Sequence, residues 1–228
     1  AFAGNPYFID IDRLIEAGLI KKEEADNYFF GKNPKRVDFE RIFFYRYPLL
    51  RCAYKRFSPD GEYKSFLEEN AFWIEDYALF MAIKEKNHFK SWFEWEEPLK
   101  NRDEDAILKI KKDYEKTIDF YRFLQYEFFK DWYNLKEYAN KCGIEIIGDI
   151  PIYVAADSAD VWANKENFDH IENGRLKLVA ATPWEVWGNP LYNWPQMEKD
   201  GFSWWKKRFY VAEKMYDMVR IDHFGGFF

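Results

Sequence analysis

Apolar residues recur at helical spacing through the middle of the chain, from about Asp105 to Cys142. One helix face there carries an i, i+4, i+7, i+11 stripe made of Phe128, Trp132, Leu135 and Ala139. A glycine ends this pattern, and the short, nearly all-apolar run "IEIIGD" (144–149) is typical of a parallel strand that is buried on both faces. The same order recurs at 203–221, where "SWWKKRFYVAEKMYD" predicts a helix and "MVRI" predicts a strand. Two successive αβ units indicate an α/β fold.

The first half of the chain has a helical pattern with weaker boundaries. Asp10 or Asp12 can cap a short helix through "DRLIEAGL". Residues 21–57 are charged and aromatic with glycine and proline interruptions, which predicts several short helices. Apolar residues at helical spacing over 65–86 predict one or two packed helices, and the segment 89–106 has the composition of a Trp-rich loop.

In each predicted αβ unit an aspartate lies at the carboxyl end of the strand. It is Asp149 in the first unit and Asp222 in the second. In parallel α/β folds, ligands bind and chemistry happens at that end. Arg220 lies two residues before Asp222, so on an extended strand their side chains point to the same face. This pair is either a surface salt bridge, worth about 1 kcal/mol or less, or an activated carboxylate at the mouth of a barrel. The spacing leaves both interpretations open.

The composition of the chain argues against several classes of binding partner. The chain has 228 residues, with 34 Lys and Arg against 40 Asp and Glu, so it lacks the cation excess that binding to nucleic acid requires. No uninterrupted apolar run is long enough to span a bilayer, and we expect no membrane partner. Cys52 and Cys142 are too few for a disulfide framework, which favours a cytoplasmic location. The three histidines are scattered and match no metal-binding motif, so no metal is expected.

Five segments, taken in chain order, carry a resemblance to a known family: "WIEDYALFMAIKE", "FLQYEFFKDWYNLKEYA", "GIEIIGDIPIYVAADSADVWANKENF", "WGNPLYNW" and "VRIDHF". They resemble the amylomaltases, the 4-α-glucanotransferases of glycoside hydrolase family 77. The resemblance implies a (β/α)8 TIM barrel with an inserted helical subdomain, present here as an incomplete portion. Residues 1–120 would hold the early barrel and the helical insertion, and residues 121–228 the βα units. We therefore expect the barrel to continue beyond Phe228 and before Ala1.

The resemblance also implies an activity. A family member moves α-1,4-glucan segments between malto-oligosaccharides, or glucans derived from starch or glycogen, by a retaining double displacement through a covalent glycosyl-enzyme. No cofactor is expected. Asp222 would be the nucleophile, and Arg220 would position it and keep it ionised. His223 would bond a sugar hydroxyl, and Asp149 would order the network around the nucleophile. The general acid and a third carboxylate are expected after Phe228.

Trp187 matches a family tryptophan close to the bound sugar, where it would cover the apolar face of a ring while Asn189 meets the hydroxyls. The alternative is that the tryptophans of this loop only pack, which is the interpretation favoured for Trp184 and Trp194. The loop before Trp187 is shorter than is usual in the family.

Two further positions bear on the resemblance. The aspartates of "ADSADVW", Asp157 and Asp160, could bond sugar hydroxyls, but helix capping is favoured. Gly225 stands where relatives commonly have arginine.

Two other functions use the same features. A retaining α-glucosidase would have the same nucleophile, with water as the acceptor. A non-catalytic glucan-binding protein would keep the barrel without the acid. Incubation with maltotriose separates these functions, because redistribution into longer chains means transfer and release of glucose alone means hydrolysis.

Overall fold

The computed structural model describes residues 1–31, 33, 35–170, 176–182 and 185–227, and for 178–182 and 185–187 it describes the backbone alone. The chain forms two compact units. The helical unit consists of Ala3–Ala78 and Lys116–Trp132, and the strand-bearing unit of Ala1–Phe2, Leu79–Glu115 and Tyr133–Phe228. The boundary expected near residue 120 stays a prediction.

The helical unit holds a 3-10 helix η1 (Pro6–Phe8), the short helices α1 (Ile11–Glu16) and α2 (Lys22–Asp26), the helix α3 (Phe39–Arg56), and parts of α4 (Gly61–Lys86) and α7 (Glu115–Lys141). α1 starts where the sequence predicts, because the Asp10 carboxylate accepts hydrogen bonds from the backbone N–H groups of Asp12 and Arg13. The expectation of only short helices over 21–57 is wrong. α3 runs for 18 residues with Pro48 inside it.

Tertiary packing explains why α3 continues through its proline. A proline inside a helix costs about 3 kcal/mol, since it removes one backbone hydrogen bond and crowds the preceding turn. Leu49 and Leu50 directly follow Pro48, and both are fully buried, as is Ala53 one turn later. Burying a leucine side chain stabilises by roughly 1.5–3 kcal/mol, so two leucines offset the loss. The local sequence pattern does not show which residues will be buried by distant parts of the chain, so it could not predict this helix.

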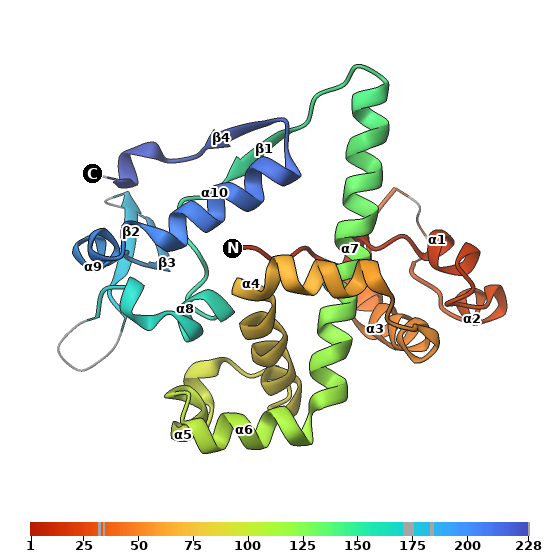
Figure 1. Cartoon of the computed structure of the whole chain (residues 1–228), viewed down its shortest axis with the longest axis horizontal. Coiled ribbons are helices and arrows are strands. Elements are labelled where there is room, and N and C mark those ends of the chain that lie inside the picture. The colour runs from red at the N-terminus through yellow and green to blue at the C-terminus, as the bar shows by residue number, and fades with distance from the viewer. Residues whose placement is uncertain (32, 34, 171–175, 183–184, 228) are drawn as a thin grey trace. The chain divides into compact units, whose positions relative to one another are not determined.

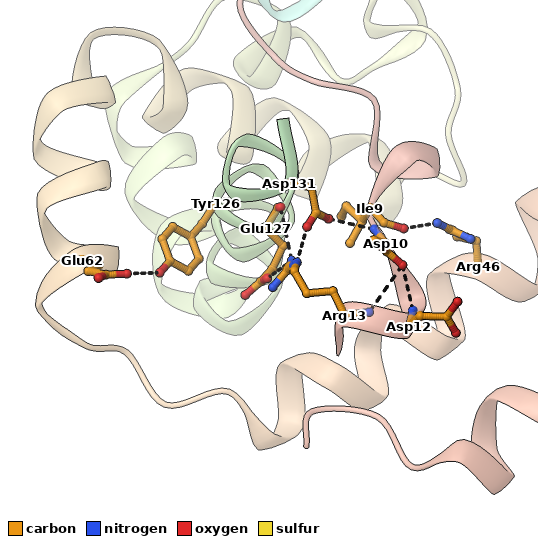
Figure 2. A network of polar contacts seen from close by, with 9 residues as sticks. All are labelled: Ile9, Asp10, Asp12, Arg13, Arg46, Glu62, Tyr126, Glu127 and Asp131. Carbon is orange, nitrogen blue, oxygen red and sulfur yellow. Dashed lines mark hydrogen bonds and ion pairs between the residues drawn. The ribbon is translucent and has the colours of Figure 1, made fainter. Parts of the chain in front are cut away.

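The core of the helical unit lies between α3, α4 and α7. Its fully buried side chains include Ile74 of α4 and, on α7, Phe120, Phe123 and Leu124. Figure 2 shows how α1 is tied to α7: the Arg13 guanidinium contacts the carboxylates of Glu127 and Asp131, and Asp131 Oδ2 accepts the N–H of Asp10 at 2.8 Å.

The strand-bearing unit contains the end of α4, η2 (Trp92–Glu94), α5 (Glu97–Lys100), α6 (Glu104–Asp113), the end of α7, β1 (Ile147–Ile150), α8 (Ala159–Ala163), η3 (Lys165–Asn167), β2 (Leu178–Thr182), β3 (Glu185–Pro190), α9 (Trp194–Lys199), α10 (Ser203–Met215), β4 (Met218–Ile221) and η4 (Phe224–Phe227). The Trp-rich segment is more ordered than the expected loop, since η2 and α5 form there. Trp92 and Trp95 are buried, and the Trp95 ring lies 5.7 Å from that of Trp162. Ring packing organises this segment.

Two small sheets form in this unit. β1 and β4 pair in parallel, with α10 against them (Figure 1), and Asp149 lies opposite Arg220 in the register. β2 and β3 form an antiparallel pair. The two αβ units predicted from the sequence are therefore present and adjacent. β1 is not buried on both faces as expected, because its burial alternates along the strand and Ile147 is exposed.

Asp217 holds the starting ends of β1 and β4 together. Its carboxylate accepts the N–H of Ile146 at 2.8 Å and the side-chain amide of Asn140 at 2.8 Å. Hydrogen bonds from Ile146 and Asn140 keep the pKa of Asp217 below its usual range. Among the described residues, no helix is both long and apolar enough to cross a membrane.

Candidate functional site

The parallel register of β1 and β4 brings the predicted acidic and basic residues together at the carboxyl ends of both strands. Arg220 Nη1 lies 3.3 Å from Asp149 Oδ2, and Arg220 Nη2 lies 3.0 Å from Asp222 Oδ1. The backbone N–H of Asp222 also donates to the carbonyl of Ile150 at 3.2 Å, which continues the ladder by one bond. One guanidinium thus sits between two carboxylates. We call Asp149, Arg220 and Asp222 the Arg220 cluster.

The Arg220 cluster is open to solvent. The side chain of Arg220 is 65% exposed, and those of Asp149 and Asp222 are 54% and 53% exposed. Ion pairs this exposed contribute about 1 kcal/mol or less to folding. The arrangement is therefore poorly explained as a stabilising device. It presents two carboxylates and a planar donor group to whatever binds at the strand ends.

His223 follows Asp222 in a left-handed backbone conformation, with φ of 49°. Such values are uncommon outside glycine and recur at functional sites. The turn is closed by a hydrogen bond from the N–H of Gly226 to the carbonyl of His223 at 2.9 Å. The His223 ring lies 6.2 Å from the ring of Tyr153, centre to centre. The segment after β4 therefore packs against the segment after β1.

Gly226 lies close to the side chains of the segment after β1. A Cβ at that position would lie 2.7 Å from Ile152 Cδ1 and 3.0 Å from the Tyr153 hydroxyl oxygen. A larger residue at position 226 would require these side chains to shift.

The segment after β1, Pro151–Val154, accepts hydrogen bonds from two side chains that were not predicted from the sequence to have a role. Tyr192 Oη donates to the carbonyl of Ile152 at 2.5 Å, and Arg208 Nη1 donates to the same carbonyl at 3.0 Å. Arg208 Nη2 also donates to the carbonyl of Pro151. The sequence did contain a sign of this role, because Arg208 falls on the apolar face of its helix. That face of α10 is buried and also carries Trp204, Trp205, Val211 and Ala212. A charged residue on an apolar helix face predicts a buried polar role.

Trp187 and Asn189 lie on β3, in the antiparallel sheet rather than in the β1–β4 pair. The side chain of Trp187 and all of Trp184 lie outside the described residues. Asn189 is half-buried, and within the described part of the chain no hydrogen bond or ion pair joins it to the Arg220 cluster. The roles expected for Trp187 and Asn189 stay predictions.

The two aspartates of "ADSADVW" do not cap α8. Ser158 is the cap, and its hydroxyl accepts the N–H of Val161 at 3.3 Å. The Asp157 carboxylate instead accepts the N–H of Trp92 at 3.1 Å and pairs with Lys84 at 2.5 Å. Asp160 is buried. Capping was the wrong interpretation for both aspartates, because the Ser158 hydroxyl makes the cap and the partners of Asp157 are distant in the sequence.

Trp194 packs as the sequence analysis favours. Its ring lies 5.1 Å from that of Tyr192 and 6.3 Å from that of Trp205, centre to centre.

Within the described ranges, no group of three or more His, Cys, Asp or Glu side chains has the arrangement of a metal site. The polar groups that converge at the strand ends are thus the Arg220 cluster and His223. Together they offer two carboxylates, a guanidinium that pairs with both, and an imidazole.

Comparisons with known proteins agree with one another. A family model described as glycoside hydrolase 77, 4-alpha-glucanotransferase, matches residues 1–228. The 4-alpha-glucanotransferase of Clostridium butyricum is 44% identical and that of Thermus thermophilus 41% identical; the matches cover 100% of this chain and 49% and 47% of those proteins.

A solved structure, an amylomaltase from Streptococcus agalactiae in complex with acarbose, is 40% identical with a TM-score of 0.91. That match covers 100% of this chain and 48% of the solved chain. The chain thus spans about half the length of the curated relatives it matches.

Proposed function

Since the chain belongs to the glycoside hydrolase 77 family of 4-alpha-glucanotransferases, we propose that the full-length protein moves α-1,4-glucan segments between malto-oligosaccharides with retention of configuration. The observation that carries the proposal is the Arg220 guanidinium between Asp149 and Asp222 at the ends of two adjacent parallel strands. Relatives that bear the same activity in their names support it.

The proposed fold is a (β/α)8 barrel with an inserted helical subdomain, of which these residues form a part. The parallel β1–β4 pair, with α10 leading into β4, supports this proposal. The likeness to the Streptococcus agalactiae amylomaltase supports it too. Active sites of such barrels lie at the carboxyl ends of the strands, which is the end that the Arg220 cluster occupies.

The proposed reaction has two displacements. Asp222 attacks the anomeric carbon, the glycosidic C–O bond breaks, and the departing oxygen takes a proton from a carboxylic acid. The 4-hydroxyl of an acceptor glucan then attacks the glycosyl-enzyme ester and gives its proton to that carboxylate. Two inversions give net retention. In this proposal the general acid is a glutamate outside residues 1–228.

The other residues have supporting roles in the proposal. Arg220 donates to Asp222 and fixes the carboxylate for attack, and Asp149 holds the other side of the guanidinium. His223 bonds a sugar hydroxyl beside the reacting carbon, while Trp187 and Asn189 bind the sugar ring. The substrates are malto-oligosaccharides or glucans from starch or glycogen. We place the protein in the cytoplasm, which the free thiols of Cys52 and Cys142 support.

Incubation of the full-length protein with maltotriose, followed by analysis of the products, tests the proposal. Transfer converts maltotriose into shorter and longer glucans, with little free-glucose release beyond what balances chain growth. Glucose and maltose without longer products would show hydrolysis instead. Binding without any product would show a glucan-binding protein. Either of these two outcomes would overturn the proposed function.

A further inference from the structure

Arg208 is a buried cation whose hydrogen bonds go to backbone carbonyls. It is 5% exposed, and its guanidinium carbon lies 5.4 Å from the ring centre of Trp204 and 4.8 Å from that of Trp205. Burial lowers the pKa of Arg208 below its ordinary value. A buried charge persists only where its donors are satisfied. Here two aromatic faces and two carbonyl oxygens meet that requirement.

Both carbonyls belong to the residues that directly follow β1. Arg208 donates to the oxygens of Pro151 and Ile152, which are two and three residues after Asp149. The Tyr192 hydroxyl donates to the Ile152 oxygen as well, at 2.5 Å. Burial raises the pKa of Tyr192, so its hydroxyl remains a donor. The backbone of a segment with no helix or strand is thus fixed by Arg208 of α10 and by Tyr192 of the connection between β3 and α9.

The fixed segment carries Tyr153 toward the site. The Tyr153 ring stacks on that of Tyr192, with centres 6.1 Å apart and planes 16° apart. The centre of the His223 ring lies 6.2 Å from that of the Tyr153 ring. A continuous set of contacts therefore runs from Arg208, through Ile152 and Tyr153, to His223 beside Asp222.

We infer that Arg208, together with Tyr192, is a positioning residue for the transfer reaction: it fixes the Pro151–Ile152 backbone so that Tyr153 holds His223 against the nucleophile. The inference rests on the proposed function. The planar fork of arginine serves two successive carbonyls at once, which the point charge of lysine does not. Misplacement by about 1 Å can lower a rate by ~10²-fold, and the effect falls on kcat because the displaced groups act at the reacting carbon.

The experiment compares variants of the full-length protein. Arg208→Met is expected to lower kcat for maltotriose redistribution by ~10²-fold with KM changed far less. Because methionine ends near the position of Nε, the space of the Cζ and Nη atoms stays empty, and low concentrations of guanidinium ion should restore part of the lost kcat. Arg208→Lys should remain impaired. Tyr192→Phe, which removes one oxygen, gives a smaller loss of kcat and serves if Arg208→Met fails to fold.

Arg102→Met is the matched control. The Arg102 guanidinium carbon lies 4.3 Å from the Trp162 ring centre, so this variant also removes an arginine from an indole face. It should keep wild-type kcat and show no guanidinium rescue. A folded Arg208→Met protein with wild-type kcat would overturn the inference. So would equal losses in both variants with no rescue, since the losses would then reflect packing alone.

Amide hydrogen exchange separates failure of this inference from failure of the proposed function. The inference expects faster exchange of the Asp222 amide, which donates to the carbonyl of Ile150 beside the anchored Pro151, in Arg208→Met than in the wild type, whatever reaction the protein catalyses. If the wild type does not redistribute maltotriose but this exchange rises, the proposed function fails and the anchoring role stands. Unchanged exchange in the variant would overturn the anchoring itself.

Discussion

Each unit of the protein has an arginine between two carboxylates, and the two groups differ in burial. In the helical unit, Arg13 Nη2 lies 2.5 Å from Glu127 Oε2 while Arg13 Nε pairs with Asp131 (Figure 2). In the strand-bearing unit, Arg220 lies between Asp149 and Asp222. The charges are the same. The side chain of Glu127 is 3% exposed and that of Arg13 20%, against 65% for Arg220.

Burial decides what each group can do. Removing one partner of a buried pair leaves an uncompensated charge in a medium that solvates it poorly, so the loss is large. An exposed pair is solvated either way and contributes little to folding. The Arg13 group therefore holds α1 against α7, whereas the Arg220 cluster is free to meet a ligand. Mutations should affect stability in the first and activity in the second.

The largest effect is expected for Asp222→Asn in the full-length protein. The amide keeps the shape of the carboxylate but is a poor nucleophile, so maltotriose redistribution should fall by ~10³-fold or more. Because the amide nearly matches the carboxylate in size and shape, the melting temperature should stay close to that of the wild type. Product analysis by chromatography and a thermal melt measure both. Wild-type turnover by a folded Asp222→Asn protein would refute the assignment of the nucleophile.

The Arg13→Met variant is expected to lose stability instead. It leaves Glu127 buried without its cation, which should lower the free energy of unfolding by about 3 kcal/mol. Urea denaturation measures the change. The control is Lys141→Met, which breaks the exposed Glu137–Lys141 pair on α7 and should cost no more than about 0.5 kcal/mol. Equal losses in both variants would show that burial does not distinguish them.

Arg220→Met completes the comparison. The carboxylate of Asp222 loses its orienting donor, and kcat should fall by ~10²-fold, as for other groups that stabilise charge in a transition state. Stability should change by about 1 kcal/mol or less. Steady-state kinetics and urea denaturation are the measurements. A large loss of stability with unchanged kcat would reverse the roles given to the two groups.

Local patterns predicted where the residues of the candidate site lie along the chain. The Asp10 cap, the strands ending near Asp149 and Asp222, and the Arg220–Asp222 spacing all depend on residues a few positions apart. Their adjacency follows from the rule that successive αβ units form neighbouring parallel strands. These features need no knowledge of distant contacts.

The rest depended on partners far away in the sequence. Pro48 reads as a helix break, yet buried leucines keep α3 intact. Asp157 reads as a cap, yet Lys84, 73 positions earlier, pairs with its carboxylate. Arg208 reads as one of several basic residues on α10 until the carbonyls after β1 are seen above it. In each case the local sequence allows two states, and tertiary contacts select one.

The smallest expected effect is a pH dependence in the Arg13 group. Burial raises the pKa of Glu127 above its ordinary 4.5, although pairing with Arg13 opposes this shift. The unfolded chain then loses its Glu127 proton at lower pH than the folded chain does. The contribution of this titration to stability is therefore full below pH 4.5 and declines as the pH rises through the folded pKa. Glu127→Gln removes that titration.

The measurement is the urea midpoint of the wild type and of Glu127→Gln at a series of pH values from 4 to 8. The stability of the wild type relative to that of the variant should fall as the pH rises above 4.5. The reason is that only the wild type must ionise a buried carboxyl group. A difference for Glu127→Gln that grows more favourable to the wild type with rising pH would mean that pairing with Arg13 outweighs burial.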